Sequence, residues 1–576
     1  MASTGLESGC NSDGSPYILR GSFTSLLRLA KLAALACLFV PGVIKAQTSA
    51  QIHDQVGYTQ LKTVLGNSLP IGAGVAIAQI EADSSGSPGS PVYHPITGYS
   101  DFLATDDPFS QPVIFTDASG GLSNGESNHA TTSVGQFFYG NNFSFAPGAN
   151  EVTIYEANHW LSNVLKINGG TPANSNFRVQ NFSWVGTYSN VSLDAQVLGR
   201  FDYLIDNNNI TAVVGNNLST TPNALLIHSL NAITVGISAG GNPTLPTQSY
   251  YFPGRNKPDI VSPAGASSTA TASVASAATM LHHSAAGTDA TQSETMKAIL
   301  LAGATKTEFP SWNHTPSQPL DSNFGAGELN VYNSYLIQSG GQHTGSPTQP
   351  SGPVSSDAWD YGVSSFNTPL YYTFEVPADS TATELSIALT WNADVTDSSQ
   401  GSSFTPDVSL ENLDLRFYDS SNSFLETEID SSISTANNVE HLHLLGLSEG
   451  TYTLELSNQT PGGSRDFGLA WRMETLFNDE SADFDTDNDT DGYDFLAWQR
   501  NFGNFTGSTL AEGDGDGDGD TDMADLLIFD SEFGASAGAT VARGSVPEPS
   551  AAVLGAVGMI MLYLFQRFRW STRSAG

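Results

Sequence analysis

Residues 266–278 read ASSTATASVASAA, and this run of small side chains decides how the chain folds. We expect a buried helix here, one that a neighbouring backbone packs against closely. Ser268 falls in its first turn. Free N–H groups and the positive end of the helix dipole at such a start stabilise an oxyanion, which makes Ser268 a candidate nucleophile. On this segment alone, a core helix without chemistry is the alternative.

The composition of the 576-residue chain indicates a large globular protein with several domains. Hydrophobic residues make up 39% and charged residues 14%, which excludes a disordered chain, and 56 Gly and 28 Pro indicate many turns. A formal net charge of −38 disfavours a nucleic-acid partner. Residues 479–534 hold 17 acidic side chains against one arginine, Arg500, and this block needs its own explanation.

Residues 1–46 are predicted to be a signal peptide for export. Arg20, Arg28 and Lys31 precede the apolar run 32–43, and Ala46 is a suitable cleavage position. Both cysteines of the chain lie in this segment, so the exported remainder has no disulfide and its small domains need another source of stability. A lipid-modified cysteine is an alternative.

Residues 55–336 alternate short apolar runs with amphipathic stretches. This pattern predicts an α/β domain with a mostly parallel sheet and helices on both faces. Residues 192–206 are an expected helix with apolar side chains on one side. The expected strands are 75–80, 151–155, 177–183, 210–214 and 232–236. Sites in such sheets lie beyond the carboxyl ends of the strands, where Glu81, Ser183 and Asn216 fall.

Residues 337–356 are rich in Gly, Ser, Pro and Gln, and we interpret them as a linker. Residues 357–475 then alternate with period two in short runs separated by turn residues, which predicts an antiparallel β-sandwich. The runs are 371–376, 384–391, 413–417, 439–445 and 452–456. No catalytic set stands out in them, so an accessory or packing domain is the simplest interpretation.

The acidic block, residues 479–535, contains an internal repeat with a spacing of 31 residues. Each copy places carboxylates at loop positions 1, 3, 5, 7, 9 and 12 and continues into a helical stretch, an arrangement that wraps one Ca²⁺ ion. Aspartate replaces the usual glutamate at position 12. The predicted metal ligands are Asp483, Asp485, Asp487, Asp489 and Asp494, and Asp514, Asp516, Asp518, Asp520 and Asp525. A solvated acidic tail does not account for two copies in register.

This pair of loops and helices resembles a dockerin-type module, a small helical calcium-loop pair. The resemblance covers nearly all of residues 483–534. It implies Ca²⁺ as the bound ion and a cohesin-like domain as a candidate partner.

The C-terminal residues 546–573 begin with VPEPS, continue with the apolar run 551–565 and end among arginines. The run is short for a hydrocarbon core of about 30 Å, and the arginines mark its inner side. The segment resembles a PEP-CTERM sorting tail, which implies a transmembrane segment, transient membrane anchoring and removal by a sorting protease. A plain C-terminal anchor is the alternative. Both termini thus predict an exported protein of the cell envelope or extracellular space.

The α/β region also supplies the components of a serine hydrolase, namely a nucleophile, a base, an orienting acid and an oxyanion donor. Ser268 is the candidate nucleophile and His129 the candidate base. Glu81, at the end of the first strand, is the candidate acid, and Asp83 stays open because it lies on the same face of an extended chain. Asn216, together with the N–H of Ser268, is the candidate donor.

Eight stretches carry a family likeness in the right order: 75–81, 129–135, 146–155, 181–186, 214–216, 257–263, 267–275 and 324–330. Together they resemble the motifs of the subtilase (subtilisin-like) serine endopeptidases over about residues 71–334. The resemblance implies a subtilisin-like α/β fold and cleavage of protein or peptide substrates through a Ser-His-Glu triad.

The chain also departs from that family. Glu81 stands where the family usually has aspartate, and Ala130 and Thr132 replace a glycine and a second histidine. Ala272 and Ser273 replace a Pro-His pair. Two hypotheses follow: an exported serine endopeptidase, or a catalytically inactive envelope scaffold or adhesion protein that carries a calcium-binding interaction module.

Overall fold

The computed structural model describes residues 48–533, apart from 86–89, 106–108, 168, 185, 187–189, 217–224, 243–250, 256, 400–402, 478–480, 488, 505–506 and 518. The expected signal peptide and the expected sorting tail lie outside these residues and remain predictions. Among the helices of the described part, none is both long and apolar enough to cross a membrane.

The chain divides into two compact units. The first holds the α/β region and most of a large antiparallel sheet. The second holds the chain from Glu474 onward, together with two short internal segments, Glu375–Glu384 and Leu445–Gly450.

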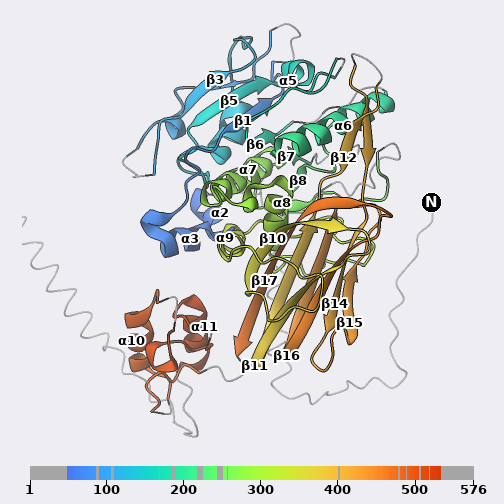
Figure 1. The fold of residues 1–576 in the computed structure, drawn as a ribbon. Helices are drawn as coiled ribbons and strands as arrows, with labels where there is room; N and C mark the ends of the chain where they lie inside the picture. Colours follow the sequence, from blue (N-terminus) through green and yellow to red (C-terminus); the bar gives the residue numbers. More distant parts are fainter. Residues whose placement is uncertain are drawn as a thin grey trace, which may run out of the picture. The chain divides into compact units, whose positions relative to one another are not determined.

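A seven-stranded sheet forms the centre of the first unit, and its strand pairs are all parallel (Figure 1). In sheet order the strands are β3 (Ile114–Asp117), β5 (Glu151–Glu156), β1 (Ile77–Glu81), β6 (Val179–Phe182), β7 (Thr211–Gly215), β8 (Ile233–Ile237) and β9 (Ile260–Ser262). The five expected strands are present, each within two residues of its expected ends. The edge strand β3 was missed because its side chains alternate between exposed and partly buried, without an apolar run.

Both faces of the parallel sheet are buried, as the expected α/β architecture requires. Successive residues of β1 enter different apolar clusters: Ile77 joins the cluster that contains helix α7 (Ser267–Ser284), whereas Ala78 and Ile80 join the cluster that contains α6 (Val191–Asn208). Gln79 and Glu81 therefore face α7. Strand β1 lies between β5 and β6. After β1 the chain therefore forms the strands on one side of β1, namely β3 and β5, before it forms β6 on the other side.

The remaining helices of this unit surround the sheet. The polar stretch after residue 47 forms two helices that the sequence had not predicted, and Thr48 caps the first of them. They are α2 (Ser49–Gln55) and α3 (Tyr58–Leu65); the others are a π-helical segment (His129–Gly135), α4 (Gln136–Phe138), α5 (Ala157–Asn163), α8 (Ser293–Ala302) and α9 (Val331–Ser339). The short strands β2 (His94–Pro95) and β4 (Glu126–Ser127) pair beside the π-helical segment.

The region expected to be a β-sandwich is antiparallel, as predicted, but its described strands form one connected six-stranded sheet and one ribbon instead of two separate sheets. In sheet order the strands are β10 (Asp357–Ser365), β17 (Ser464–Phe477), β11 (Leu370–Thr390), β16 (Val439–Asn458), β14 (Leu413–Asp419) and β15 (Thr427–Ser432), and the ribbon is β12 (Asp394–Asp397) with β13 (Pro406–Ser409). The expected strands 371–376 and 384–391 form one continuous strand, β11, and the expected strands 439–445 and 452–456 form one continuous strand, β16. The turn residues within each pair do not end the strand. Phe374 contacts both Trp471 and Phe417, on either side of its own strand, and this indicates a curled sheet.

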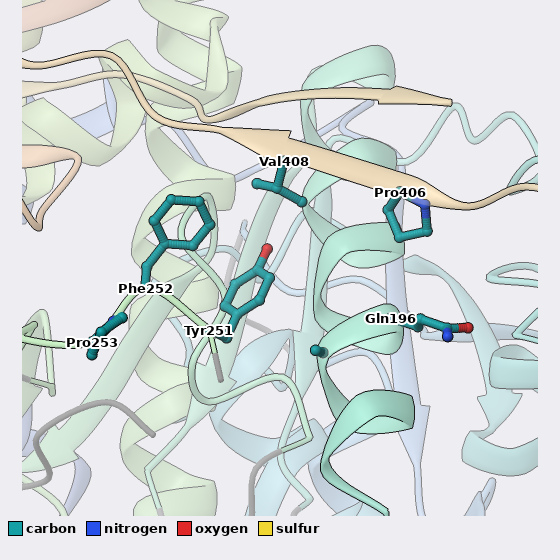
Figure 2. Close-up of a pocket in the computed structure, with 7 residues that line it drawn as sticks. Gln196, Tyr251, Phe252, Pro253, Pro406 and Val408 are labelled. Carbon is teal, nitrogen blue, oxygen red and sulfur yellow. The ribbon is translucent and has the colours of Figure 1, made fainter. Parts of the chain in front are cut away.

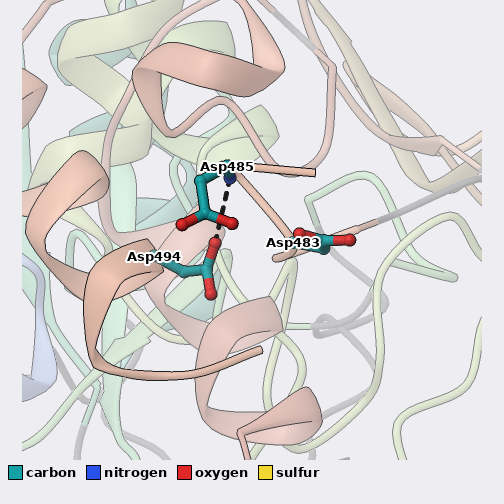
Figure 3. A group of neighbouring side chains, drawn as sticks. All are labelled: Asp483, Asp485 and Asp494. Atoms are coloured by element: carbon teal, nitrogen blue, oxygen red, sulfur yellow. Dashed lines mark hydrogen bonds between the residues drawn. The ribbon is translucent and has the colours of Figure 1, made fainter. Parts of the chain in front are cut away.

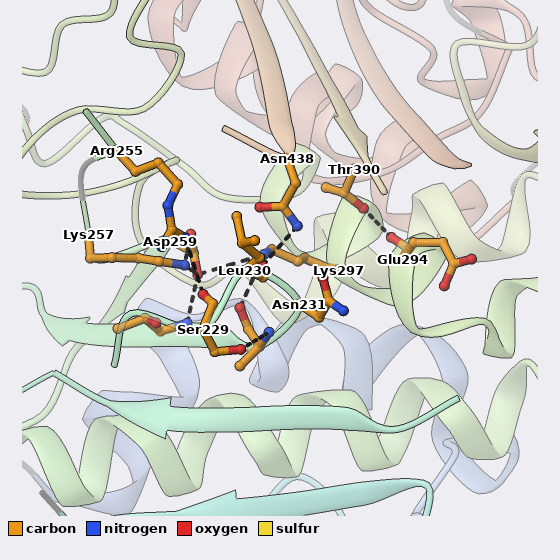
Figure 4. Close-up of polar contacts among 12 residues, drawn as sticks. Ser229, Leu230, Asn231, Arg255, Lys257, Asp259, Glu294, Lys297, Thr390 and Asn438 are labelled. Atoms are coloured by element: carbon orange, nitrogen blue, oxygen red, sulfur yellow. Dashed lines mark hydrogen bonds and ion pairs between the residues drawn. The ribbon is translucent and has the colours of Figure 1, made fainter. Parts of the chain in front are cut away.

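Hydrogen bonds join the antiparallel sheet to the α/β region within the first unit (Figure 4). The Thr390 hydroxyl donates to the carbonyl of Glu294, at the start of α8. The Asn438 amide donates to the carbonyl of Leu230 at 2.8 Å, which also accepts from the Lys297 ammonium at 3.1 Å. All these side chains are buried, so these contacts fix the sheet against α8 and the segment before β8.

The second unit contains two helices, α10 (Gly492–Asn501) and α11 (Met523–Glu532), each preceded by an acidic loop. Their shared apolar core contains Phe484, Trp498 and Phe529. Asp491 and Asp522 cap the two helices at equivalent positions of the repeat.

Close packing of β17 on α8 yields a stability prediction. A Cβ atom added at Gly468 would lie 2.4 Å from backbone atoms of Thr295. We expect Gly468→Ala to lower the free energy of unfolding by about 1–3 kcal/mol, because backbone cannot move aside as a flexible side chain can. Urea denaturation of the full chain measures the change.

Gly352→Ala is the matched control, since a Cβ there meets no described atom within 4 Å. We expect it to stay within about 0.5 kcal/mol of the unsubstituted protein. Equal denaturation midpoints for the two variants would contradict the packing seen at Gly468.

Candidate active site

Three of the predicted site residues form a continuous hydrogen-bonded chain. The Nδ1 atom of His129 lies 2.9 Å from Oε2 of Glu81, and its Nε2 atom lies 3.0 Å from Oγ of Ser268. They come from the end of β1, the start of the π-helical segment and the first turn of α7. Glu81 and His129 are 48 positions apart in sequence, and His129 and Ser268 are 139 positions apart. The fold brings all three together at the carboxyl edge of the sheet.

Glu81 fixes which nitrogen of His129 carries the proton. A carboxylate only accepts hydrogen bonds, so Nδ1–H donates to Glu81 and Nε2 is left to accept from the Ser268 hydroxyl. The Glu81 side chain is 1% exposed, whereas the His129 side chain is 38% exposed. The hydrogen bond to Glu81 raises the pKa of His129 above its usual value, and burial acts in the opposite direction.

Asp83, the other candidate acid, makes different contacts. Its carboxylate accepts hydrogen bonds from the backbone N–H groups of Ser85 at 2.7 Å and Val92 at 2.9 Å. These bonds hold the loop after β1. The geometry therefore favours Glu81 as the partner of His129.

The start of α7 places Ser268 against the neighbouring strand β6. The Ser183 hydroxyl, just beyond β6, donates to the carbonyl of Ser268 at 3.0 Å, and the Ser183 carbonyl lies 3.3 Å from the Ser268 hydroxyl oxygen. Ser268 is half-buried, and the helix is buried from Ala270 to His282. Ala272 and Ser273, which differ from the resembled motif, lie inside this continuous helix and do not interrupt it.

Asn216, the predicted oxyanion donor, follows the last residue of β7. The position just before it approaches α7 closely, because a Cβ at Gly215 would lie 2.9 Å from Oγ1 of Thr271 and 3.8 Å from the Ser267 carbonyl oxygen. Asn216 is 0% exposed, and within the described part of the chain neither polar atom of its side chain has a hydrogen-bond partner. A buried amide without a hydrogen-bond partner costs about 1–3 kcal/mol.

Two residues next to Glu81 were missed in the sequence. Gln79 is fully buried beside Glu81 on β1, and Tyr139 follows α4 and contacts Gln79. The one available signal was a polar residue in an otherwise apolar strand, two positions before the acid and so on the same face.

A separate cavity of about 320 Å³ lies between α6, residues 251–253 and β13 (Figure 2). Tyr251, which lines it, donates a hydrogen bond from its hydroxyl to buried Asp202. None of the predicted site residues lines this cavity. Its lining is Ala195, Gln196, Tyr251, Phe252, Pro253, Pro406 and Val408.

The two acidic loops of the second unit each gather carboxylates, as shown for the first loop in Figure 3. One oxygen of each member lies within 4.8 Å of the others in four groups: Asp483, Asp485 and Asp494; Asp489, Asp491 and Asp494; Asp514, Asp516 and Asp525; and Asp520, Asp522 and Asp525. The carboxylate at position 12 belongs to both groups of its loop. This carboxylate is also buried in both loops.

The position-12 carboxylate organises each loop in the same way. In the first loop Asp494 accepts from the N–H groups of Phe484 and Asp491 at 2.6 and 2.8 Å. In the second loop Asp525 accepts from Gly515 and Asp522 at 2.6 and 2.7 Å. Burial raises the pKa of Asp525 to about 6.

The structure changes the list of candidate ligands. Asp487 is outside the four groups, although its carboxylate accepts from the N–H of Asp489, and Asp518 lies outside the described residues. Asp491 and Asp522, the position-9 carboxylates of the predicted loop pattern, were not among the predicted ligands but join these groups, and they also cap α10 and α11.

No family model and no curated protein sequence matches the chain. Similar solved structures include the serine protease of Aeromonas sobria in complex with its chaperone (11% identity, 70% of this chain and 88% of that chain, TM-score 0.31). Others are tripeptidyl peptidase 2 (13%, 60% and 40%, 0.25) and MycP1 from Mycobacterium smegmatis (15%, 55% and 89%, 0.29). At these identities and TM-scores the similarity assigns no residue and no activity, which therefore rest on the geometry above.

Proposed function

We propose that this protein is a serine endopeptidase that cleaves peptide bonds through Ser268, His129 and Glu81. The observation that carries the proposal is the chain of two hydrogen bonds from Ser268 to His129 and on to Glu81. A serine hydroxyl is a weak nucleophile unless an adjacent base accepts its proton and a third group orients that base.

The proposed reaction follows from these contacts. As the Ser268 oxygen attacks the peptide carbonyl carbon, its proton passes to Nε2 of His129, and Glu81 stabilises the imidazolium that forms. The resulting oxyanion accepts hydrogen bonds from the Asn216 amide and the Ser268 N–H. His129 then gives its proton to the leaving amine, the C–N bond breaks, and a water molecule activated by His129 releases the acyl group from Ser268.

We also propose that each acidic loop of the second unit binds one Ca²⁺ ion. Crowded carboxylates repel one another, as the raised pKa of Asp489 beside Asp487 illustrates, and a hard divalent cation removes that repulsion. Asp483, Asp485 and Asp494 would hold the ion in the first loop, and Asp514, Asp516 and Asp525 in the second. Oxygen-only donor sets of this kind suit calcium.

Export, a sorting tail processed by a sorting protease and a cohesin-like partner remain proposals drawn from the sequence. The catalytically inactive envelope scaffold remains the alternative function. The departures at Ala130 and Thr132 motivate it, and the labelling experiment below separates it from the peptidase.

A serine-directed fluorophosphonate probe tests the nucleophile. We expect the folded protein to be labelled and Ser268→Ala to abolish labelling, because the probe bonds only to an activated serine oxygen. Mass spectrometry locates the label. Ser267→Ala, which removes a neighbouring hydroxyl from the same helix, is the control and should label normally; a folded protein that never labels would favour the scaffold.

The pH dependence of labelling tests the acid. His129 must be neutral to accept the serine proton, so the labelling rate should rise with pH through a midpoint above 6.5, since Glu81 raises the pKa of His129. Glu81→Gln removes the charge that stabilises the imidazolium. It should move the midpoint to lower pH and slow labelling by about 10³–10⁴-fold. An unchanged midpoint would argue against Glu81 as the orienting acid, and Asp83→Asn is the matched control.

Calcium removal tests the acidic loops. With a chelator, limited proteolysis of the full chain should cut faster within residues 483–533, because repulsion among the carboxylates then opens the loops. Added Ca²⁺ should restore protection, whereas Mg²⁺ at the same concentration should protect less, since it demands a smaller octahedral site. Identical digestion patterns with and without Ca²⁺, or protection that survives Asp483→Ala combined with Asp514→Ala, would rule out the calcium sites.

A further inference from the structure

Gln79, next to Glu81, is a buried polar side chain with three hydrogen bonds. It is 0% exposed, in the middle of β1. Its amide nitrogen donates to Oε1 of Glu81 at 2.8 Å and to the carbonyl of Ala130 at 2.9 Å. Its amide oxygen accepts from the Tyr139 hydroxyl at 2.6 Å. Both donors and the acceptor of the amide are thus used.

These partners fix the orientation of the amide. If the group were flipped, its oxygen would face a carboxylate and a carbonyl, both of which only accept hydrogen bonds. The Tyr139 hydroxyl supports the same orientation as a donor. Burial, and next the charge of Glu81, raise the pKa of Tyr139 well above its usual value, so the phenol stays protonated.

The π-helical segment makes room for this contact. A Cβ atom at Gly135 would lie 2.5 Å from the Tyr139 hydroxyl oxygen and 2.8 Å from the ring of Phe102. Any larger residue at Gly135 would therefore displace the Tyr139 side chain from Gln79. The same segment contributes the Ala130 carbonyl and His129, so Gln79 bonds to the backbone one residue after the base.

A glutamate needs such a contact more than an aspartate does. Its side chain has one more rotatable bond, so a single hydrogen bond to His129 leaves the carboxylate free to rotate. Gln79 holds the second oxygen while His129 holds the first. The amide nitrogen of Gln79 therefore bridges the Glu81 carboxylate and the Ala130 carbonyl, which belongs to the same segment as His129.

We propose that Gln79 is a positioning residue, which fixes the Glu81 carboxylate relative to the His129 segment so that a glutamate can orient the histidine. Gln79 acts only through Glu81 and does not touch the reacting atoms. This inference rests on the proposed function.

The test compares Gln79→Met, Glu81→Ala and the double variant in the full chain. Met keeps the length of Gln but forms none of its hydrogen bonds. Two quantities are measured: the pKa of His129, from ring NMR signals assigned with a His129→Asn variant, and the labelling rate with the fluorophosphonate probe. We expect Gln79→Met to lower the His129 pKa toward that of Glu81→Ala and to slow labelling about 10–100-fold. In the Glu81→Ala background it should change neither quantity further.

Gln180→Met is the matched control. Gln180 is a buried glutamine on the adjacent strand β6, paired in register with Ala78, and it therefore lies on the opposite face of the sheet from Glu81. It should leave both quantities unchanged. Tyr139→Phe, which removes only the hydroxyl that holds the Gln79 oxygen, should shift both in the same direction by less and serves if Gln79→Met does not fold.

Three results are decisive. If Gln79→Met and Tyr139→Phe leave the His129 pKa and the labelling rate unchanged while Glu81→Ala alters them, Gln79 has no positioning role. If Gln79→Met slows labelling equally in the Glu81→Ala background, its role is general stability, and the proposal is wrong. If the unsubstituted protein never labels but the His129 pKa responds as expected, the positioning contact stands and the proposed peptidase activity fails.

Discussion

Close packing of α7 on the parallel sheet is the constraint on which the candidate site depends. The helix lies directly on β6, β7 and β8, and it can do so because its buried residues are mostly alanine, serine and threonine. Gly215 marks how close this approach is, since even a methyl group there would crowd Thr271. Hydrogen bonds fail beyond about 3.5 Å, so bulkier side chains under the helix would separate Ser268 from His129.

A second constraint is the buried charge of Glu81. A carboxylate removed from water must be compensated by donors or by a cation. In the described part of the chain, the imidazole of His129 and the amide of Gln79 hydrogen-bond to this carboxylate. Because neutral dipoles and a titratable ring surround the acid, the environment of Glu81 favours the imidazolium, as the raised pKa of His129 reflects. A fixed lysine or arginine at the same place would compete with that stabilisation.

The sequence contained enough information for five strands of the parallel sheet, for their carboxyl ends and for the order in which Glu81, His129, Asn216 and Ser268 occur. Apolar runs of a buried parallel sheet are visible in one dimension, and a strand end needs no knowledge of its neighbours. The contact between Gln79 and Tyr139 could not be predicted from the sequence. They are 60 residues apart, and their contact depends on how the π-helical segment lies on β1. The sequence predicted two short strands in place of β11 and two in place of β16, because local turn residues suggested breaks. Pairing with neighbouring strands keeps each of them continuous.

Glu81 is longer than the acid usual at its position, whereas Asp494 and Asp525 are shorter than the acid usual at theirs. In both cases hydrogen-bond donors hold the carboxylate in place. Beside His129, a glutamate stands where the resembled family usually has aspartate, and Gln79 holds the carboxylate oxygen that does not face His129. In the acidic loops, an aspartate stands at position 12 where a glutamate is usual, and its side chain is one methylene shorter. The loop closes on this carboxylate, because the backbone N–H groups at loop positions 2 and 9 donate to Asp494 in the first loop and to Asp525 in the second. In both places the length of the side chain sets how far the carboxylate extends from the backbone, and the surrounding hydrogen-bond donors fix the position of the negative charge.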